Sequence, residues 1–308
     1  MSNIKTQYGI LNDAKLVGRY NTGEPEEYMI NGRSVLNILG YSMMPLYEIT
    51  NTRRKEMPSV KLYKDGKIKI ISLQEAIQIR TTIGAFEAEK IVFYESGAIK
   101  RVFPLDGKLS GYWSEEDEYE LAKEENFEFI FGEIKAKVIA MHFYESQELK
   151  SLSFWPKEII DVFIDKRLIK TRIGITFYKD GKVSSCEPYE PTYISTPIGE
   201  VQAYDENAIG IHGEQNSLEF YEDGRVKSLI TSTNVIEVCK ENGQIDTHSP
   251  KEVMLFSNSD VKDLITVSIE FQDDNIIIDK KFKYNIKKDK FVVKNFGQKL
   301  VLFGDLNN

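Results

Sequence analysis

Side chains able to do acid–base or nucleophilic chemistry are few in this sequence and lie far apart. The histidines His142, His212 and His248 have no i, i+4 spacing, and neither Cys186 nor Cys239 has a histidine close to it in the chain. A metal site on one helix needs that spacing, and a cysteine nucleophile needs a base within hydrogen-bond reach. The sequence therefore predicts no metal, no cofactor and no catalytic residue, and we expect the protein not to be an enzyme.

One internal stretch groups polar side chains that could still form a small site. The segment AIGIHGEQNSLEF (208–220) is the most loop-like part of the interior and carries His212 and Glu214. A histidine beside a carboxylate is a common proton-transfer arrangement. The alternative is a polar connector between strands. An enzyme is the third choice of function, and it would need a deep pocket that joins His212 and Glu214 to acids from another part of the chain.

A second candidate binding site lies in an insertion, residues 104–130. Ser114 followed by an acidic run is typical of a helix that begins with an N-cap and a negatively charged first turn. Two aromatic residues precede it and would supply anchors for docking a basic partner. The alternative is a solvated surface helix whose aromatics pack into the sheet. The candidate binding residues of the insertion are Tyr112, Trp113, Glu115, Glu116 and Glu118.

Composition and charge limit the classes of function. A hydrophobic content of 41% and a charged content of 29% predict a folded, soluble protein. A net charge of -8 argues against nucleic-acid binding through a positive surface. No apolar run is long enough to cross a membrane, and no apolar leader is present. We therefore expect a cytoplasmic protein with free thiols, whose partner is another protein rather than a membrane.

A repeated sequence motif indicates which secondary-structure elements position these residues. FYESGAIK (93–100), FYKDGKVS (177–184) and FYEDGRVK (220–227) are nearly the same, and LYKDGKIK (62–69) and FYESQELK (143–150) follow the pattern. Asp-Gly or Ser-Gly between strand-forming residues is a strong β-hairpin signal, because Gly adopts positive φ without steric cost. The structural residues of these hairpins are Tyr63, Gly66, Tyr94, Gly97, Tyr144, Tyr178, Gly181, Tyr221 and Gly224.

The length of the hairpin loop decides which residues face each other. A two-residue loop places each tyrosine opposite the following aliphatic residue, for example Tyr63 opposite Ile68, and sets the repeated lysine against the neighbouring Phe or Leu ring. A three-residue loop with a glycine bulge shifts this register by one residue. In the third copy Gln147 replaces the glycine, and we expect strain or a different turn there.

A second phrase, with glycine after an aromatic or aliphatic residue, lies between the hairpins. It reads YGIL (8–11), IGAF (83–86), FGEI (131–134) and IGEV (198–201). Pro197 and Gly199 in TPIG suit the second and last positions of a turn. We therefore predict strand turns at Gly84, Gly132 and Gly199. Each unit then contains a hairpin, a connecting strand, a glycine turn and a further strand.

These patterns predict an all-β protein, an elongated antiparallel sheet of about six tandem β-hairpin repeats. Residues 1–59 form an N-terminal cap with a short helix near Ser34–Leu39, and residues 60–256 form the hairpin array. Residues 257–308 contain a degenerate copy, with Ser259 and Asp260 at its loop, and a basic C-terminal capping hairpin. The lysines of that hairpin are Lys280, Lys281, Lys283, Lys287, Lys288 and Lys290.

The Tyr-x-x-Gly hairpins of residues 60–230 resemble those of MORN-like bacterial proteins, particularly the YwqK-type antitoxins. The resemblance implies an extended antiparallel sheet used as a binding surface, and the antitoxin group implies a protein partner. The Gly-x-Gly and Trp-x-x-Gly elements of MORN repeats are missing, so a lipid-binding role is not carried over. We predict a non-catalytic protein-interaction scaffold, with carbohydrate or small-ligand binding as the alternative.

Overall fold

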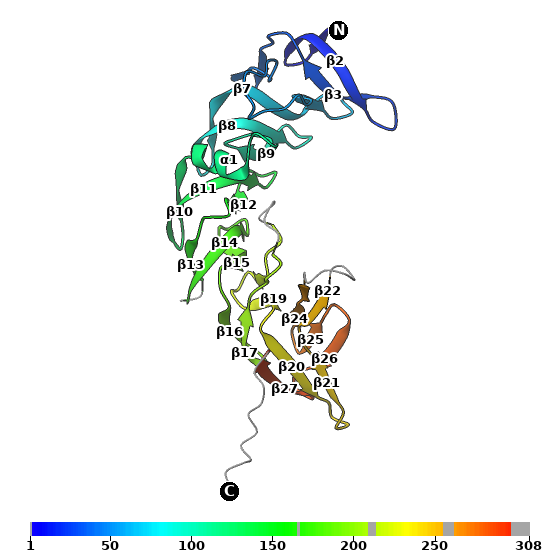
Figure 1. The fold of residues 1–308 in the computed structure, drawn as a ribbon, viewed down its shortest axis with the longest axis vertical. Coiled ribbons are helices and arrows are strands. Elements are labelled where there is room, and N and C mark those ends of the chain that lie inside the picture. Colours follow the sequence, from blue (N-terminus) through cyan, green and yellow to red (C-terminus); the bar gives the residue numbers. More distant parts are fainter. Residues whose placement is uncertain (1, 165–166, 209–213, 255–261, 297–308) are drawn as a thin grey trace. The chain divides into compact units, whose positions relative to one another are not determined.

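The computed structural model describes residues 2–164, 167–208, 214–254 and 262–296 (Figure 1). In these residues the chain is almost entirely β, with one helix, α1 (Glu115–Leu121), which confirms the all-β prediction. Two compact units are present. Unit 1 comprises residues 1–160, 176–182 and 211–214, and unit 2 comprises residues 161–175, 183–210 and 215–308. The division between them falls inside the predicted hairpin array.

Unit 1 is built on antiparallel pairing between strands that mostly follow each other in the chain. Strand β2 pairs with β1 and β3, β3 with β6, β6 with β7, β7 with β8, β8 with β9, β9 with β11, and β11 with β12. Strand β10 pairs with the first half of β11, and β4 pairs with β5. The bounds are β1 Ser2–Thr6, β2 Gly9–Arg19, β3 Pro25–Ile30, β4 Leu36–Ile38, β5 Tyr41–Met43, β6 Val60–Leu62, β7 Ile68–Thr81, β8 Gly84–Phe93, β9 Ile99–Phe103, β10 Glu124–Phe129, β11 Gly132–Phe143 and β12 Leu149–Phe154.

Unit 2 contains the remaining strands, and the division between the units passes through β13 and β14. Strand β18 pairs with β15 and β19, β19 with β24, β24 with β25, and β25 with β26. Strand β20 pairs with β21 and β27, and two further pairs are β16 with β17 and β22 with β23. The bounds are β13 Ile160–Ile164, β14 Arg167–Phe177, β15 Val183–Pro188, β16 Thr192–Thr196, β17 Gly199–Ala203, β18 Leu218–Phe220, β19 Val226–Thr231, β20 Asn234–Cys239, β21 Ile245–His248, β22 Lys251–Met254, β23 Lys262–Ile265, β24 Val267–Gln272, β25 Asn275–Ile278, β26 Phe282–Asn285 and β27 Lys290–Asn295.

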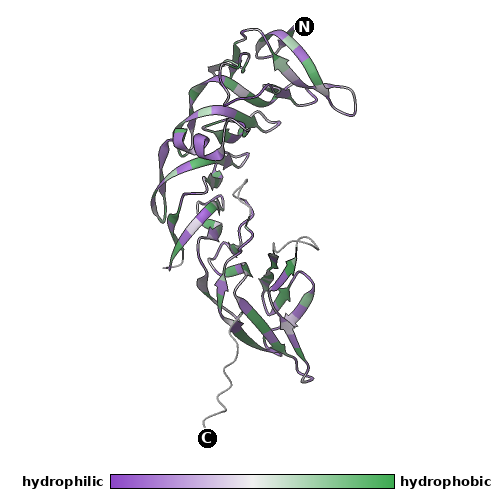
Figure 2. Cartoon of the chain, viewed as in Figure 1, coloured by the Kyte–Doolittle hydropathy of each residue, from purple (hydrophilic) through white to green (hydrophobic). Residues whose placement is uncertain are grey.

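Alternation of side chains explains why these segments are strands. In β20 the buried positions are Asn234, Ile236 and Val238, and the residues between them are half-exposed. Such a period of two puts one face of a strand in the core and the other toward solvent. Figure 2 shows the same exchange of hydrophobic and hydrophilic residues along many strands. Burial of large side chains on the inner faces, such as Phe93 and Phe143, is the main stabilising contribution.

The predicted hairpin turns occur, but with the longer of the two loops. Gly66 N–H donates to Tyr63 O (2.9 Å), Tyr63 N–H donates to Lys67 O (2.7 Å), and Gly66 has φ +82°. Leu62, and not Tyr63, is therefore the partner of Ile68. This is the three-residue loop with a glycine bulge. The expected Tyr63–Ile68 pair is wrong, because the extra bulge residue moves every pairing by one position.

The bulge also changes what the repeated lysine covers. Lys69, Lys100 and Lys150 place their ammonium groups 5.8, 5.3 and 5.9 Å from the ring centres of Tyr63, Tyr94 and Tyr144, respectively. The expectation that the lysine stem covers the neighbouring Phe or Leu is therefore wrong. An ammonium over a tyrosine ring is attracted by the negative face of the ring.

The turn at Gln147 keeps the geometry of the others despite the lack of glycine. Gln147 N–H donates to Tyr144 O (2.9 Å), and Gln147 itself adopts φ +77°. Its side-chain amide donates to Ile99 O (2.9 Å) and to Tyr144 O (3.2 Å). The expected strain is therefore present, and the expected change of turn is not. The two side-chain hydrogen bonds offset part of the energetic cost of positive φ at a residue with a Cβ.

The same turn also occurs where the sequence comparison did not place it. Tyr20 O accepts from Gly23 N–H (2.8 Å), and Lys240 O accepts from Gly243 N–H (2.8 Å). The first of these turns joins β2 to β3, and the second joins β20 to β21. The residues that flank these two turns differ from the repeated phrase, but each turn keeps glycine at the position of positive φ.

The glycine phrases form tight two-residue turns, as predicted. Thr81 pairs with Gly84, Phe129 with Gly132, and Thr196 with Gly199. In the first and last of these turns the threonine hydroxyl donates to the glycine carbonyl at 2.9 and 2.7 Å. The glycines at 84, 132 and 199 adopt φ between +111° and +134°, where side chains are strained.

The ends of the chain contain one correction. The predicted short helix near Ser34–Leu39 is wrong: Leu36–Ile38 is strand β4, which turns at Leu39 and Gly40 into β5. Alternate burial of Leu36 and Ile38 explains the strand. The predicted C-terminal hairpin appears as β25 and β26. The loop predicted at Ser259 and Asp260 lies outside the described residues.

Candidate functional site

The insertion of unit 1 carries the helix that its sequence predicts. Helix α1 begins after Ser114, whose hydroxyl accepts a hydrogen bond from Asp117 N–H while the Asp117 carboxylate accepts from Ser114 N–H. This reciprocal capping box satisfies two backbone donors at the start of the helix. The helix has only seven residues. Its stability must therefore come from contacts with the rest of unit 1.

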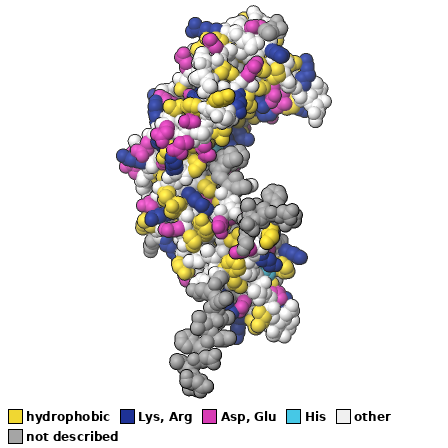
Figure 3. All heavy atoms as spheres, viewed as in Figure 1, with side chains coloured by type: hydrophobic (Ala, Val, Ile, Leu, Met, Phe, Trp, Pro, Cys, Tyr) yellow, Lys and Arg dark blue, Asp and Glu magenta, His cyan; other side chains and the backbone are white. Residues whose placement is uncertain are grey.

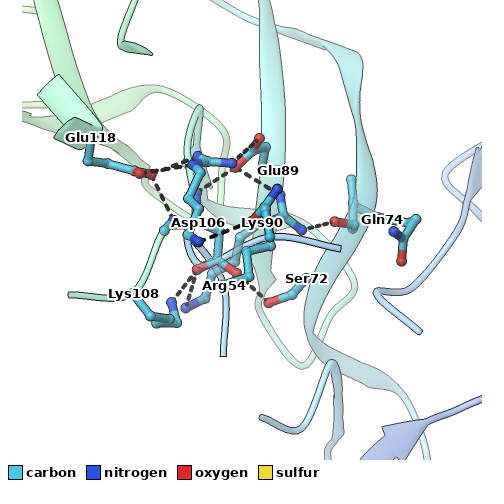
Figure 4. A network of polar contacts seen from close by, with 12 residues as sticks. Arg54, Ser72, Gln74, Glu89, Lys90, Asp106, Lys108 and Glu118 are labelled. Carbon is cyan, nitrogen blue, oxygen red and sulfur yellow. Dashed lines mark hydrogen bonds and ion pairs between the residues drawn. The ribbon is translucent and has the colours of Figure 1, made fainter. Parts of the chain in front are cut away.

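Glu118 supplies those contacts, and its side chain turns inward. It is only 4% exposed. Arg53 donates to both of its carboxylate oxygens (2.9 and 2.7 Å), and Gly107 N–H and Trp113 Nε1–H donate to the same carboxylate at 2.8 and 2.6 Å. The prediction that Glu118 binds a partner is therefore wrong, because its side chain is buried. Glu118 instead holds the insertion onto the sheet (Figure 4).

Arg53 joins this carboxylate to a second one on β8. Its guanidinium also donates twice to Glu89, at 2.9 and 2.7 Å, so it is held between two bidentate partners. Burial disfavours the charged guanidinium, but the hydrogen bonds that it donates to Glu89 and Glu118 outweigh this and raise the pKa of Arg53. Burial raises the pKa of Glu89, and its bonds to Arg53 and the charge of Arg54 more than reverse that, so that its pKa is lowered. Both ions therefore stay charged at neutral pH.

A third buried carboxylate continues the network toward β7. Asp106 accepts from Ser72 Oγ (2.7 Å) and lies 2.5 Å from Lys108 Nζ and 3.4 Å from Lys90 Nζ. Burial raises the pKa of Asp106, but the two ammonium groups outweigh it and lower the pKa. Burial lowers the pKa of Lys90. These residues come from β7, β8 and the first residues of the insertion, so the network fastens the start of the insertion to the sheet.

The same anchoring leaves a distinct part of the insertion exposed. Tyr112 is 84% exposed and Leu109 is 58% exposed, although the loop between them is tied by Ser110 N–H to Trp113 O (2.8 Å). Trp113 is only half-exposed, because its indole nitrogen reaches Glu118. Glu115 and Glu116 are exposed, and Glu116 forms an ion pair with Lys157. Figure 3 shows acidic and basic side chains interspersed with apolar ones on the visible face.

The other candidate, Glu214, lies beside residues that sequence reasoning did not connect to it. Its carboxylate contacts His142 Nδ1 and accepts from Arg101 Nη2 at 2.7 Å. His142 pairs with Arg101 on β9 and with Ser151 on β12, so the three side chains form a row across adjacent strands. His212 lies outside the described residues. The one available signal was the alternation of β11, which sets His142 on a face with polar neighbours.

The neighbours of Glu214 stabilise its negatively charged form. Burial raises the pKa of Glu214, but the hydrogen bond and charge of His142 and the charge of Arg101 lower it to about 2. Burial lowers the pKa of His142, against the opposing effect of Glu214. The other ring nitrogen of His142 lies 3.4 Å from the Tyr94 hydroxyl, which donates to Phe143 O at 2.9 Å. Each group thus has a structural partner in unit 1.

Unit 2 contains a buried acid of different character. Glu187 is 1% exposed and accepts from Ser217 N–H (2.7 Å) and Ser217 Oγ (2.9 Å). Burial raises its pKa to about 7, because Ser217 and Arg172, whose Nη2 is 3.8 Å away, offset only part of the desolvation. On the preceding residue, burial raises the pKa of the Cys186 thiol to about 12. A thiol so disposed is unreactive.

Several chemical features are absent from the described part of the chain. Within it, no group of three or more His, Cys, Asp or Glu side chains is placed to hold a metal ion. Both cysteines are free thiols. No helix among the described residues is long and apolar enough to cross a membrane. Comparison with known protein families, curated proteins and solved structures gives no match.

Proposed function

We propose that this protein is a non-catalytic β-hairpin repeat protein that acts as an interaction scaffold, and that the insertion of unit 1 binds another protein. The observation that carries the proposal is Tyr112, which is 84% exposed on a loop fastened by the buried Arg53–Glu118 and Arg53–Glu89 pairs. An exposed tyrosine on an ordered loop buries a large area when a partner covers it, and loses little conformational entropy in doing so.

The charge of the same surface indicates what kind of partner it would accept. Glu115, Glu116 and Asp117 are exposed in the first turn of α1, and the exposed Leu109, three residues before Tyr112 in the chain, adds apolar area. A partner with a basic rim around an apolar pocket complements this pattern. Because the anchoring network is internal, the surface is already in one conformation before it binds, which lowers the entropic cost of association.

The resemblance to YwqK-type antitoxins suggests that the partner is a toxic protein encoded by the same cell. We place the interaction in the cytoplasm, where two free thiols remain reduced. Neither nucleic acid nor membrane is part of the proposal, which agrees with the net charge of -8.

Site-specific photo-crosslinking tests this function. The photoreactive residue p-benzoylphenylalanine replaces Tyr112 in the full chain, expressed in the source cells, and crosslinked proteins are identified by mass spectrometry. The matched control is the same replacement at Tyr189, a tyrosine of unit 2 that is 43% exposed. We expect one protein to be captured at Tyr112 and not at Tyr189, and its capture to fall at least fivefold when Glu115 and Glu116 are changed to Lys. Equal capture at both positions, or no capture at Tyr112, would show the proposal to be wrong.

A further inference from the structure

Unit 2 contains a groove that the insertion does not explain. Its volume is about 250 Å³, and its floor includes Ile164, Ile169, Ile194 and Phe271. The groove lies beside the last residue of β13, the first residues of β14, the β16–β17 turn and the hairpin that follows β18. Arg167 and Arg225 line it together with Asp273, and Arg225 forms an ion pair with Asp223 at 2.7 Å. The groove is therefore lined by buried apolar side chains and by charged side chains at exposed positions.

The corresponding place in unit 1 is filled by phenylalanine rings. Phe129 of β10 stacks on Phe177 with ring centres 4.9 Å apart, and Phe131 stacks on Phe129 at 5.0 Å. Phe177 O accepts the Tyr144 hydroxyl, just as Phe271 O accepts the Tyr221 hydroxyl (2.8 and 2.7 Å). Phe177 and Phe271 are therefore equivalent residues of the two hairpin systems.

Alignment of the two-residue turns shows which rings are missing. Gly132 and Gly199 occupy the same turn position, so Thr196 stands where Phe129 stands and Ile198 where Phe131 stands. Threonine is too short to cover Phe271 as Phe129 covers Phe177. The groove of unit 2 thus lies where unit 1 uses aromatic side chains of its own, and an aromatic ring is the group whose shape fits it.

Strand β16 gives the groove an open main-chain edge. It pairs with β17 alone among the strands of the described chain. The closing pair of a two-residue hairpin loop, here Thr196 and Gly199, is hydrogen-bonded, so the main-chain groups of Tyr193 and Ser195 point away from β17. Ser195 also lines the groove. A row of outward N–H and C=O groups is a template for an added strand.

We propose that this groove binds an extended segment of another protein, which pairs its main chain with β16 and places an aromatic side chain over Phe271. An acidic residue next to the aromatic one would meet Arg167, because Arg225 is already ion-paired with Asp223. The site is independent of the insertion in unit 1, so either can fail without the other.

Selection of displayed random dodecapeptides on the full chain tests this inference. We expect enriched peptides that carry Phe, Tyr or Trp next to Asp or Glu. Thr196→Phe should weaken their binding at least tenfold, because the new ring would cover Phe271 as Phe129 covers Phe177 in unit 1. Thr81→Phe is the matched control: it removes the same threonine bond from the same type of turn in unit 1, and it should leave binding unchanged. The turn itself tolerates Phe, as Phe129 demonstrates.

Two further measurements separate the outcomes. Hydrogen exchange on the complex should slow at the amides of Tyr193 and Ser195, and Arg167→Glu should weaken acidic peptides at least fivefold. The inference is overturned if no aromatic peptide is enriched, or if the enriched peptides bind Thr196→Phe as tightly as the wild type. It is also overturned if sedimentation shows a dimer that Thr196→Phe dissociates, since a second copy would then be the occupant.

Discussion

The hydroxyl of Tyr63 donates to the backbone carbonyl of Phe93 at 2.7 Å, and Phe93 directly precedes the tyrosine of the next hairpin. The same bond recurs from Tyr20 to Leu62, from Tyr94 to Phe143, from Tyr144 to Phe177 and from Tyr221 to Phe271, at 2.7–2.9 Å. Each tyrosine therefore ties its own turn to the following hairpin. This explains why the tyrosine recurs, and it gives the ring a structural task inside each unit.

Removing one such hydroxyl should weaken unit 1. Tyr94→Phe leaves the Phe143 carbonyl without its donor, and we expect the free energy of unfolding to fall by about 1 kcal/mol. Urea denaturation measures this, with Tyr193→Phe as the control, because the Tyr193 hydroxyl makes no hydrogen bond to any described residue and should change nothing. Equal stability of both variants would contradict a role for the tyrosine bond.

Gly107 provides a test of the charged network. A Cβ at this position would overlap the Glu118 carboxylate, so Gly107→Ala must push Glu118 away from Arg53. Because buried polar groups then lose hydrogen-bond partners, we expect the free energy of unfolding to fall by about 1–3 kcal/mol and hydrogen exchange to be faster across the insertion. Gly111→Ala is the control, since a Cβ there meets no atom within 4 Å. An unchanged exchange rate in Gly107→Ala would argue that Glu118 does not anchor the insertion.

The raised pKa of Glu187 predicts an unusual pH dependence for unit 2. A carboxyl with a pKa of about 7 in the folded state and 4.5 when unfolded takes up a proton on folding. Its contribution to stability is present below pH 4.5 and is lost as the pH rises through 7, by at most about 3 kcal/mol.

Glu187→Gln removes this titration and isolates its contribution. The stability of wild type relative to Glu187→Gln should therefore fall between pH 5 and pH 8, measured by urea denaturation at each pH. If the difference between the two proteins does not change with pH, the carboxyl is already ionised at pH 5.

Gln147 allows the cost of its positive φ to be measured. Gln147→Ala loses both side-chain hydrogen bonds and keeps a Cβ at φ +77°, so we expect it to be the least stable protein of the series. Gln147→Gly loses the same bonds but removes the backbone strain, so its free energy of unfolding should exceed that of the Ala variant by about 1 kcal/mol. Thermal or urea unfolding of the pair checks this, and an Ala variant as stable as the Gly variant would mean that the turn is not strained.

Local sequence patterns predicted much of the fold and little of the candidate site. The turns at Gly84, Gly132 and Gly199 were predictable because a tight turn involves only a few consecutive residues and favours glycine where φ is positive. Loop length was not, since one bulge residue separates two registers that the same letters permit. Of the candidate residues, Tyr112, Glu115 and Glu116 are exposed, whereas Glu118 is buried. A run of acids does not reveal which one meets a distant arginine.

What the amino-acid sequence determined by itself is therefore the class of fold: alternating side chains make strands, and glycine turns reverse them, through interactions only a few residues long. The tertiary structure alone decided which polar groups meet. Arg53 reaches Glu118 across 65 residues, and His142 reaches Glu214 across 72. Such pairs depend on how folded strands stack, because buried charges find partners in space and not along the chain.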